Sequence, residues 1–295
     1  MRFSEFSLKI VLVFLFCSIF ICGCQKKSLG KNNKNENLSD FDFFPTSIIS
    51  LSPAATEILF SIGAENQIVA VSDFSDYPPQ AQNLPKIGGF DGKTLSFEKI
   101  LSFKPDFVYL TNGMHNFLIE QLEQNGIKYY LSDATSVSEI FDEISEVGAL
   151  IGHEKKATQV VSLLKSRLED IQKNQNSILP AVYYEVWNEP FMSCGSSSFV
   201  SDVISLAGGK NIFADLKDSY PIVSEEAIIS KNPQYIIIAK SSSVSEDVIK
   251  NRIGWSNLDA VKNNQIYIID DDLLCRPAPR ILDSIEQLSA IFSKK

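Results

Sequence analysis

From residue 46 onward, short apolar runs alternate with segments whose apolar residues recur at helical spacing. The runs predict buried strands and the segments between them predict amphipathic helices. The predicted strands are 47–52, 68–73, 107–111 and 128–133, and the predicted helices are 53–63, 95–105, 115–126 and 136–152. Strands separated by helices indicate a parallel, doubly wound sheet.

A long segment from Glu154 to about Gln175 contains no glycine or proline and predicts one straight helix of roughly 30 Å. Beyond it the alternation resumes, with predicted strands at 181–187, 234–239 and 265–270 and a last helix at 279–292. We therefore predict an α/β fold of two doubly wound lobes, 46–152 and 179–295, joined by a single linker helix within 153–178. A rigid helical linker should allow little closure of the lobes.

The first 45 residues follow a different pattern. Arg2 and Lys9 precede the apolar run IVLVFLFCSIFICG, and polar residues follow Cys24 at once. This arrangement is typical of a secretory signal, and the run is shorter than the roughly 20 residues of a membrane span. Because Ile21 to Cys24 resembles a bacterial lipobox, we predict a signal peptide at 1–23, lipidation of Cys24 and a flexible tether at 24–45. An uncleaved membrane anchor is the alternative.

Charge and cysteine content narrow the possible partners. The net charge of −9 argues against binding to nucleic acid. Beyond Cys24, only Cys194 and Cys275 remain in the predicted mature chain, too few for a disulfide framework. They would be able to bridge each other in an oxidising compartment, but we expect free thiols.

The sequence lacks a recognisable catalytic or metal-binding constellation. Its two histidines, His115 and His153, cannot assemble a multi-histidine zinc site. His153-Glu154 begins like a zinc-protease helix, yet the position four after His153 is Ala157. We therefore expect no enzymatic activity, no metal site and no cofactor.

Aromatic and polar residues gather in the loops that follow the predicted strands. In open α/β sheets ligands bind beyond the carboxyl ends of the strands, and a cleft between two lobes is a common pocket. Each residue alone is explained by ordinary packing, but together they predict a site for a large, flat, partly apolar ligand with polar edges. The candidates are Tyr77, Phe90, Trp187, Phe191, Tyr220, Asp272 and Arg276.

Segments spread over residues 47–292 resemble the periplasmic cobalamin-binding proteins of ABC importers. In order they are IISLSPAATEILFSIG, SDYPPQAQ, LSFEKILSFKPDFVYL, GIKYYLSDATSVSEI, SLAGGKNIF, PIVSEEAI and RPAPRI. The resemblance implies a class III periplasmic-binding-protein fold and a monomeric, lipid-anchored protein on the outer side of a bacterial membrane. It would capture a corrinoid as cargo and deliver it to an ABC permease dimer with its ATPase subunits. A haem or ferric-siderophore carrier of the same class is the alternative, and an enzyme on the same two lobes is the rival from another class.

The resemblance also implies roles for the aromatic residues. Tyr77 matches the ring-contacting tyrosine of the family, and Pro78-Pro79 would hold it as one wall of the cleft. Phe90 and Tyr220 stand where the family has tryptophans, and Phe191 matches an aromatic residue of the second lobe. Where the family has a further tryptophan, this chain has Thr111-Asn112.

Four charged residues take two different roles in the same comparison. Asp272 and Arg276 match polar residues that would meet the amide edges of the corrin. Glu98 and Glu226 occupy corresponding places, one in each lobe, and match a pair that docks on arginines of the permease. Such charge pairs steer association and set orientation.

Overall fold

A computed structural model describes residues 44–89, 93–173, 175 and 177–293. The predicted signal peptide, Cys24, residues 24–43 of the predicted tether and Phe90 lie outside the described residues. Among the described helices, none combines the length and the apolar character that crossing a bilayer requires.

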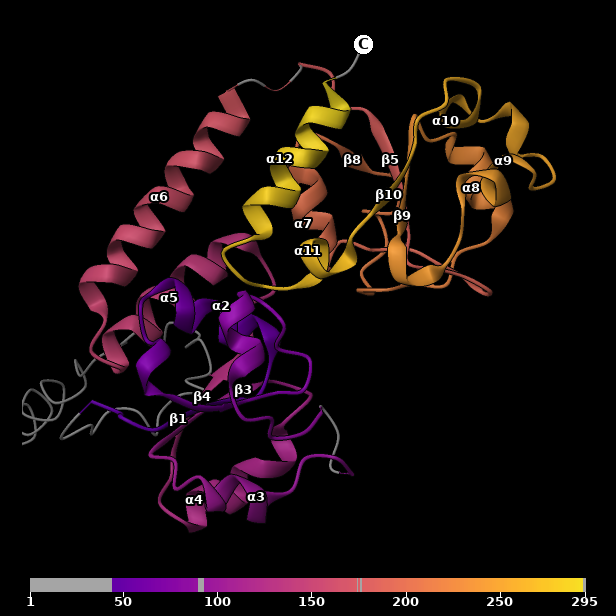
Figure 1. Cartoon of the computed structure of the whole chain (residues 1–295). Coiled ribbons are helices and arrows are strands. Elements are labelled where there is room, and N and C mark those ends of the chain that lie inside the picture. The colour runs from indigo at the N-terminus through magenta and orange to yellow at the C-terminus, as the bar shows by residue number, and fades with distance from the viewer. Residues whose placement is uncertain (1–43, 90–92, 174, 176, 294–295) are drawn as a thin grey trace, which may run out of the picture. The chain divides into compact units, whose positions relative to one another are not determined.

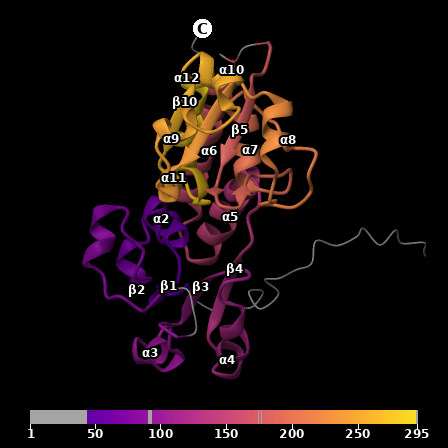
Figure 2. The same cartoon turned by 90° about the vertical axis from the view of Figure 1, so that its right-hand side faces the viewer.

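The N-terminal lobe is built on a parallel sheet with the strand order β2-β1-β3-β4. Helices α2 and α5 cover one face of this sheet and α3 and α4 cover the other (Figure 1, Figure 2). The strands are β1 (Ile48–Ser50), β2 (Ile68–Val71), β3 (Phe107–Thr111) and β4 (Lys128–Ser132). The helices are α2 (Pro53–Ser61), α3 (Phe97–Ser102), α4 (Ile119–Gln124) and α5 (Val137–Leu150).

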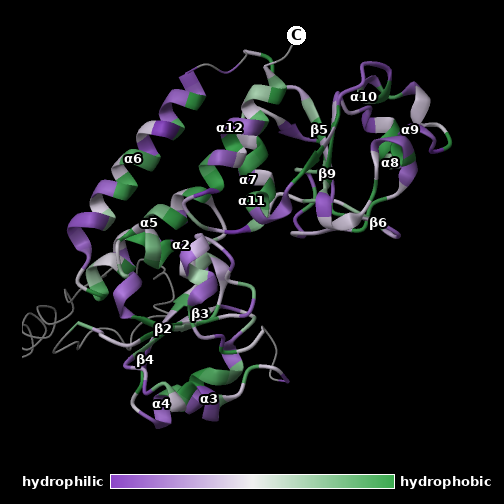
Figure 3. Cartoon of the chain, viewed as in Figure 1, coloured by the Kyte–Doolittle hydropathy of each residue, from purple (hydrophilic) through white to green (hydrophobic). Residues whose placement is uncertain are grey.

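Burial on both faces explains why these strands read as continuous apolar runs. Ile48 and Tyr109 belong to the core on the side of α2 and α5, whereas Ile49 and Val108 belong to the core on the side of α3 and α4. Figure 3 shows the contrast with a partly exposed element, because the long helix α6 (Glu154–Lys173) alternates between hydrophobic and hydrophilic residues.

Helix α6 (Glu154–Lys173) is the predicted linker, and it is continuous over 20 residues. One side of it, including Ala157, Val161 and Leu164, is buried, and the other side is mostly polar apart from the exposed Leu163. Its first turns approach α5 so closely that a Cβ added to Gly148 would lie 2.3 Å from the Cβ of Ala157. Gly148 is therefore required for this helix contact.

The C-terminal lobe contains a second parallel sheet with the order β10-β9-β5-β8. Its strands are β5 (Ala181–Glu185), β8 (Lys210–Asn211), β9 (Tyr235–Ala239) and β10 (Ile266–Ile269). Its helices are α7 (Phe199–Leu206), α8 (Glu225–Lys231), α9 (Glu246–Lys250), α10 (Asp259–Lys262), α11 (Asp271–Cys275) and α12 (Ile281–Phe292). The predicted fold class, two doubly wound α/β lobes joined by one long helix, is confirmed.

Several predicted strands were too long: β1 covers only Ile48–Ser50 of 47–52, and β2 covers only Ile68–Val71 of 68–73. The run 181–187 ends as a sheet strand at Glu185, and Trp187–Asn188 (β6) instead pairs in antiparallel fashion with Phe191–Met192 (β7). Pro190 lies in the connecting turn, where its missing N–H costs no ladder hydrogen bond. The hairpin places Trp187 and Phe191 beyond the carboxyl end of β5.

The lobes contact each other directly as well as through α6. Residues of α5, such as Ile140, and of α7, such as Val203, belong to one continuous apolar core. At the start of α5, the backbone N–H of Val137 donates to Asp202 of α7 at 2.8 Å. The resulting contact between lobes agrees with the expectation that closure is limited.

Candidate functional site

Hydrogen bonds between buried hydroxyl groups hold the loop that carries Tyr77. Ser75 Oγ lies 2.9 Å from both Ser72 Oγ and Thr56 Oγ1. Thr56 Oγ1 in turn lies 2.8 Å from Ser50 Oγ at the end of β1. This chain of hydrogen bonds connects the loop after β2 to β1 and α2. The backbone just before Tyr77 is therefore held in place.

A partly buried lysine holds the same loop. The ammonium of Lys86 donates to the backbone carbonyl of Ser75 at 2.8 Å and to that of Ala81 at 3.5 Å. These carbonyls flank Tyr77 in the sequence. The position of the tyrosine therefore depends on more than the two prolines that follow it.

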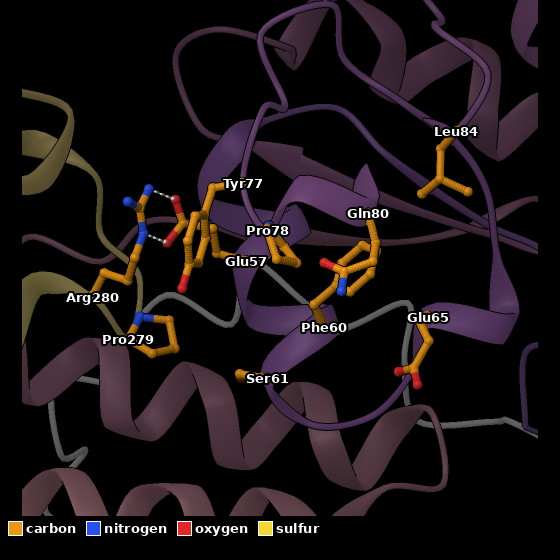
Figure 4. Close-up of a pocket in the computed structure, with 10 residues that line it drawn as sticks. All are labelled: Glu57, Phe60, Ser61, Glu65, Tyr77, Pro78, Gln80, Leu84, Pro279 and Arg280. Atoms are coloured by element: carbon orange, nitrogen blue, oxygen red, sulfur yellow. Dashed lines mark hydrogen bonds and ion pairs between the residues drawn. The ribbon is translucent and has the colours of Figure 1, made fainter. Parts of the chain in front are cut away.

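The ring of Tyr77 stacks against an arginine from the other lobe. The guanidinium carbon of Arg280, at the start of α12, lies 3.7 Å from the ring centroid. Arg280 is held by Glu57 of α2: its Nε donates to Oε2 at 2.8 Å, and a terminal nitrogen donates to Oε1 (Figure 4). The hydrogen bond to Glu57 raises the pKa of Arg280 above its usual value. Glu57 is almost fully buried, with 2% of its side chain exposed.

A cavity of about 540 Å³ opens beside this stack (Figure 4). Among the described candidates for ligand contact, Tyr77 alone lines it. The lining combines apolar and charged groups: Glu57, Phe60, Ser61, Glu65, Tyr77, Pro78, Gln80, Leu84, Pro279 and Arg280. The cavity therefore lies between residues of α2 and the Tyr77 loop on one side and the start of α12 on the other, and it does not include Trp187, Phe191, Tyr220, Asp272 or Arg276.

Arg276 connects three carboxylates at the same junction. Its Nη1 lies 2.8 Å from Asp76 Oδ1 and 3.5 Å from Glu57 Oε1, and its Nη2 lies 2.7 Å from Asp272 Oδ2. We call Glu57, Asp76, Asp272, Arg276 and Arg280 the interlobe charge cluster. Partial burial acts to raise the pKa of Asp76, but the hydrogen bond and charge of Arg276 outweigh it and hold that pKa below its usual value.

Three predicted aromatic contacts come together on the C-terminal lobe. The backbone N–H of Val223 donates to the carbonyl of Phe191 at 2.9 Å, which joins the segment bearing Tyr220 to the β6-β7 hairpin. Trp187 and Tyr220 are 46% and 43% exposed, so their rings are available to a ligand. Phe191 is half-buried and packs against Trp255, with ring centroids 5.9 Å apart.

Phe191 is also held from one side by a cation. The guanidinium of Arg252 lies 4.8 Å from its ring centroid, and Glu185 at the end of β5 binds that guanidinium at 2.6 and 2.8 Å. The hairpin is therefore anchored to the sheet beneath it. Of its two aromatic residues, Trp187 is the more exposed.

Glu98 and Glu226 occupy the same local structure in the two lobes. Each is the second residue of its helix, α3 or α8, and each follows a serine N-cap, Ser96 or Ser224. Ser96 Oγ donates to Glu98 at 2.7 Å, and this bond lowers the pKa of Glu98. A backbone hydrogen bond, followed by one from Ser224, lowers the pKa of Glu226. Both carboxylates are exposed and charged at neutral pH.

Within the described residues, no group of three or more His, Cys, Asp or Glu side chains is arranged to hold a metal ion. Cys194 is buried, Cys275 is exposed, and both are free thiols, as expected. Burial raises the pKa of Cys194 to about 12. Although Cys275 is exposed as a whole residue, desolvation of its thiol raises the pKa to about 11, so neither cysteine is a reactive thiolate at neutral pH.

Sequence reasoning missed Glu57, Asp76 and Arg280. Glu57 is the one charged residue in the predicted helix 53–63, and a charge on the buried face of a helix usually has a partner. Arg280 lies in the segment RPAPRI, but 223 positions separate it from Glu57. The sequence therefore indicates that Glu57 has a charged partner but does not show that this partner is Arg280.

Comparison with known proteins places these residues in a family. Residues 48–273 match the family described as periplasmic binding proteins. A vitamin B12-binding protein of Vibrio cholerae is 36% identical over 247 residues, which cover 82% of this chain and 87% of that protein. An uncharacterised ABC transporter substrate-binding lipoprotein of Bacillus subtilis is 32% identical over 254 residues, covering 83% and 79%.

Solved structures show the same relationship. The crystal structure of a periplasmic vitamin B12-binding protein of Vibrio cholerae is 34% identical, with a TM-score of 0.68 over 84% of this chain and 96% of that one. A possible iron-binding, periplasmic solute-binding protein of Staphylococcus epidermidis is 31% identical, with a TM-score of 0.77 over 85% and 100%. The chain belongs to the periplasmic binding protein family, in the class whose two α/β lobes are joined by one long helix.

Proposed function

We propose that the protein is a non-catalytic, substrate-binding lipoprotein that captures a corrinoid and delivers it to an ABC permease. The main support is the 36% identity to a vitamin B12-binding protein over 82% of this chain. Membership of the family implies a location outside the cytoplasm. The corrinoid would be transported cargo, so the protein itself needs no cofactor.

The proposed ligand site lies between the loops at the carboxyl ends of the two sheets. Aromatic faces bury a large apolar area at little cost in side-chain entropy, which suits the flat surface of a corrin ring. The proposed contacts are Tyr77 and Phe90 from the N-terminal lobe and Trp187, Phe191, Tyr220, Asp272 and Arg276 from the C-terminal lobe. Tyr77, Trp187 and Tyr220 are the exposed aromatic members of this set among the described residues.

The same proposal covers attachment and docking. Cys24 would carry the lipid after removal of residues 1–23, and residues 24–45 would tether the monomeric body to the membrane. Glu98 and Glu226 would dock on the permease dimer, one carboxylate for each lobe. Their support is the matched exposure and N-terminal helix position in the two lobes.

Calorimetric titration of the mature protein with cyanocobalamin, cobinamide, haemin and a ferric siderophore tests the ligand. We expect tight, one-to-one binding of both corrinoids and weak or no binding of the two iron ligands. Binding of haemin or the siderophore without binding of either corrinoid would overturn the proposal.

A haem or ferric-siderophore carrier remains the second candidate. Its support is the possible iron-binding protein of Staphylococcus epidermidis at 31% identity and a TM-score of 0.77. The absorbance spectrum of ligand that co-purifies with the protein separates the candidates, because corrinoid, haem and ferric-siderophore chromophores absorb differently.

A further inference from the structure

The charges of the interlobe charge cluster affect which chemical groups the proposed site accepts at the edge of a ligand ring. Three carboxylates, Glu57, Asp76 and Asp272, face two guanidinium groups, so the cluster carries one excess negative charge. Both terminal nitrogens of Arg276 already contact carboxylates. Both guanidinium groups are thus engaged inside the cluster, and an incoming anion would have to displace a carboxylate to reach them.

The two aspartates are the exposed members of this cluster. The side chains of Asp76 and Asp272 are 57% and 54% exposed, whereas the side chain of Arg276 is 15% exposed. Arg276 contacts Oδ1 of Asp76 and Oδ2 of Asp272, and the exposure of both carboxylates leaves them accessible to further hydrogen-bond donors. Asp76 immediately precedes the ring-contacting candidate Tyr77 in the sequence, so we expect its carboxylate at the edge of the proposed ring site.

The nearby ammonium group of Lys86 does not offset the excess negative charge of the cluster. Lys86 supports the loop from beneath, where its ammonium donates to backbone carbonyls, including that of Ser75. Arg280 is bound by Glu57 and covered by the ring of Tyr77. The exposed groups of the cluster are therefore mainly hydrogen-bond acceptors.

We propose that Asp76, together with Asp272, is a specificity-determining residue that selects ligands with uncharged amides at the ring edge and rejects ligands with carboxylates there. This inference rests on the proposed corrinoid function and deepens it. A primary amide donates N–H to a carboxylate oxygen and forms a charge-assisted hydrogen bond. A ligand carboxylate at the same place meets a like charge in a partly desolvated cleft and has no free cation to bind.

A matched pair of ligands tests the inference. Dicyanocobinamide and dicyanocobyrinic acid share the corrin ring and both axial ligands, but the second has carboxylates in place of the edge amides. We expect the unmodified protein to bind cobinamide at least about 100-fold more tightly than the acid at pH 7.5, because a site built for hydrogen-bond donors discriminates strongly against a mismatched group. Asp76→Asn alone should reduce this ratio several-fold, and Asp76→Asn with Asp272→Asn should reduce it by about tenfold or more.

The control removes the same charge elsewhere. Asp142 on α5 and Asp247 on α9 are exposed, and Asp142→Asn with Asp247→Asn should leave the ratio unchanged. Thermal unfolding of each variant checks that it is folded, and the single Asp76→Asn variant carries the test if the double variant is not. Equal binding of the two corrinoids, or an unchanged ratio in the aspartate variants, would overturn the specificity and leave the corrinoid function standing. Binding of haemin with no binding of either corrinoid would overturn both.

Discussion

At the scale of single residues, two buried carboxylates show how differently this fold accommodates charge. Glu57 is neutralised by arginines from the other lobe. Glu143 on α5 instead accepts hydrogen bonds from two hydroxyl groups, those of Tyr109 and of Ser132, the latter at 3.0 Å. Burial dominates at Glu143 and raises its pKa to about 7, although both hydroxyls act to lower it. Glu57 forms ion pairs across the lobe junction, whereas Glu143 is a group that titrates near neutrality.

Glu143 predicts a pH-dependent stability. Its pKa is higher in the folded protein than in the unfolded chain, so its contribution to stability is complete below about pH 4.5 and falls as the pH rises through about 7. Glu143→Gln removes this titration. We expect the free energy of unfolding of the variant, relative to the unmodified protein, to increase by about 2–3 kcal/mol between pH 5 and pH 8.

Urea unfolding at several pH values measures this difference. Glu120→Gln, at an exposed carboxylate on α4, is the control and should show a relative stability that does not change with pH. Parallel curves for the Glu143 variant and the unmodified protein would show that Glu143 does not titrate in this range.

Tyr77 gives the sharpest test of a single ligand contact. Tyr77→Ala should weaken corrinoid binding by about 1–3 kcal/mol, because a buried aromatic contact with the ring is lost. Phe44 is also an exposed aromatic residue, but it contacts Gly152 at the far end of α5, and Phe44→Ala should leave affinity unchanged. Titration calorimetry of both variants decides the point, and an unaltered affinity for Tyr77→Ala would remove this residue from the site.

At the scale of elements, the sequence predicts those parts of the fold that have their own periodicity. The strands β1, β3, β4 and β9 were predicted because parallel strands covered on both faces are continuous apolar runs. The linker α6 was predicted because its helical spacing is uninterrupted over 20 residues. Strand β8 and the β6-β7 hairpin have strands of two residues, too short for a periodic signal, and their pairing depends on distant segments.

Some residues of the candidate site were also predictable from the sequence, and others were not. Positions at or after the ends of predicted strands made Tyr77, Trp187 and Asp272 candidates, because the topology of a parallel sheet alone brings strand ends together. The pair Glu57–Arg280 escaped prediction because its two members come from α2 and from the start of α12, in different lobes. Ion pairs across such a sequence separation have no local pattern.

Arg280 and Arg167 form ion pairs that differ in burial, so we expect their substitution to lower the free energy of unfolding by different amounts. Arg280 binds the buried Glu57 across the lobe junction, whereas Arg167 on α6 binds Asp283 and Glu286 of α12, both nearly half exposed. Arg280→Met should lower the free energy of unfolding by about 3 kcal/mol, because a buried carboxylate loses its main partner. Arg167→Met should cost less than about 1 kcal/mol, because exposed pairs contribute little. Denaturant unfolding measures both, and equal losses would contradict the structural role assigned to Glu57–Arg280.

At the scale of the whole molecule, the lobes are held together in three ways. The linker α6 packs against α5 and α12, apolar residues of both lobes form one core, and ion pairs of the interlobe charge cluster join the lobes. A protein held so firmly presents Glu98 and Glu226 at a nearly fixed separation. The proposed recognition by a permease dimer, through one charge per lobe, would depend on such a fixed separation, since charge pairs set orientation only when both engage together.

Reversing the charges of Glu98 and Glu226 distinguishes a role in docking on the permease from a role in binding the ligand. Glu98→Lys with Glu226→Lys places like charges against the basic pockets expected on the permease, and transport of corrinoid into reconstituted vesicles should fall by at least about tenfold. Corrinoid affinity in solution should hardly change, because both residues lie on helices away from the proposed contacts. Rising salt should reduce the difference in transport, since the interaction is between exposed charges.

The matched control reverses two exposed carboxylates in the same type of position. Glu120 is the second residue of α4 and Glu154 the first of α6, so Glu120→Lys with Glu154→Lys makes the same change in net charge at two helix N-termini. Each lysine near a helix N-terminus costs about 0.3–1 kcal/mol of stability, and this cost is common to both double variants. Transport by the control should therefore stay close to that of the unmodified protein. A loss of transport as large in the control as in the Glu98 and Glu226 variant would show a general effect of charge. A loss of corrinoid affinity with intact permease binding would instead place Glu98 and Glu226 in the ligand site.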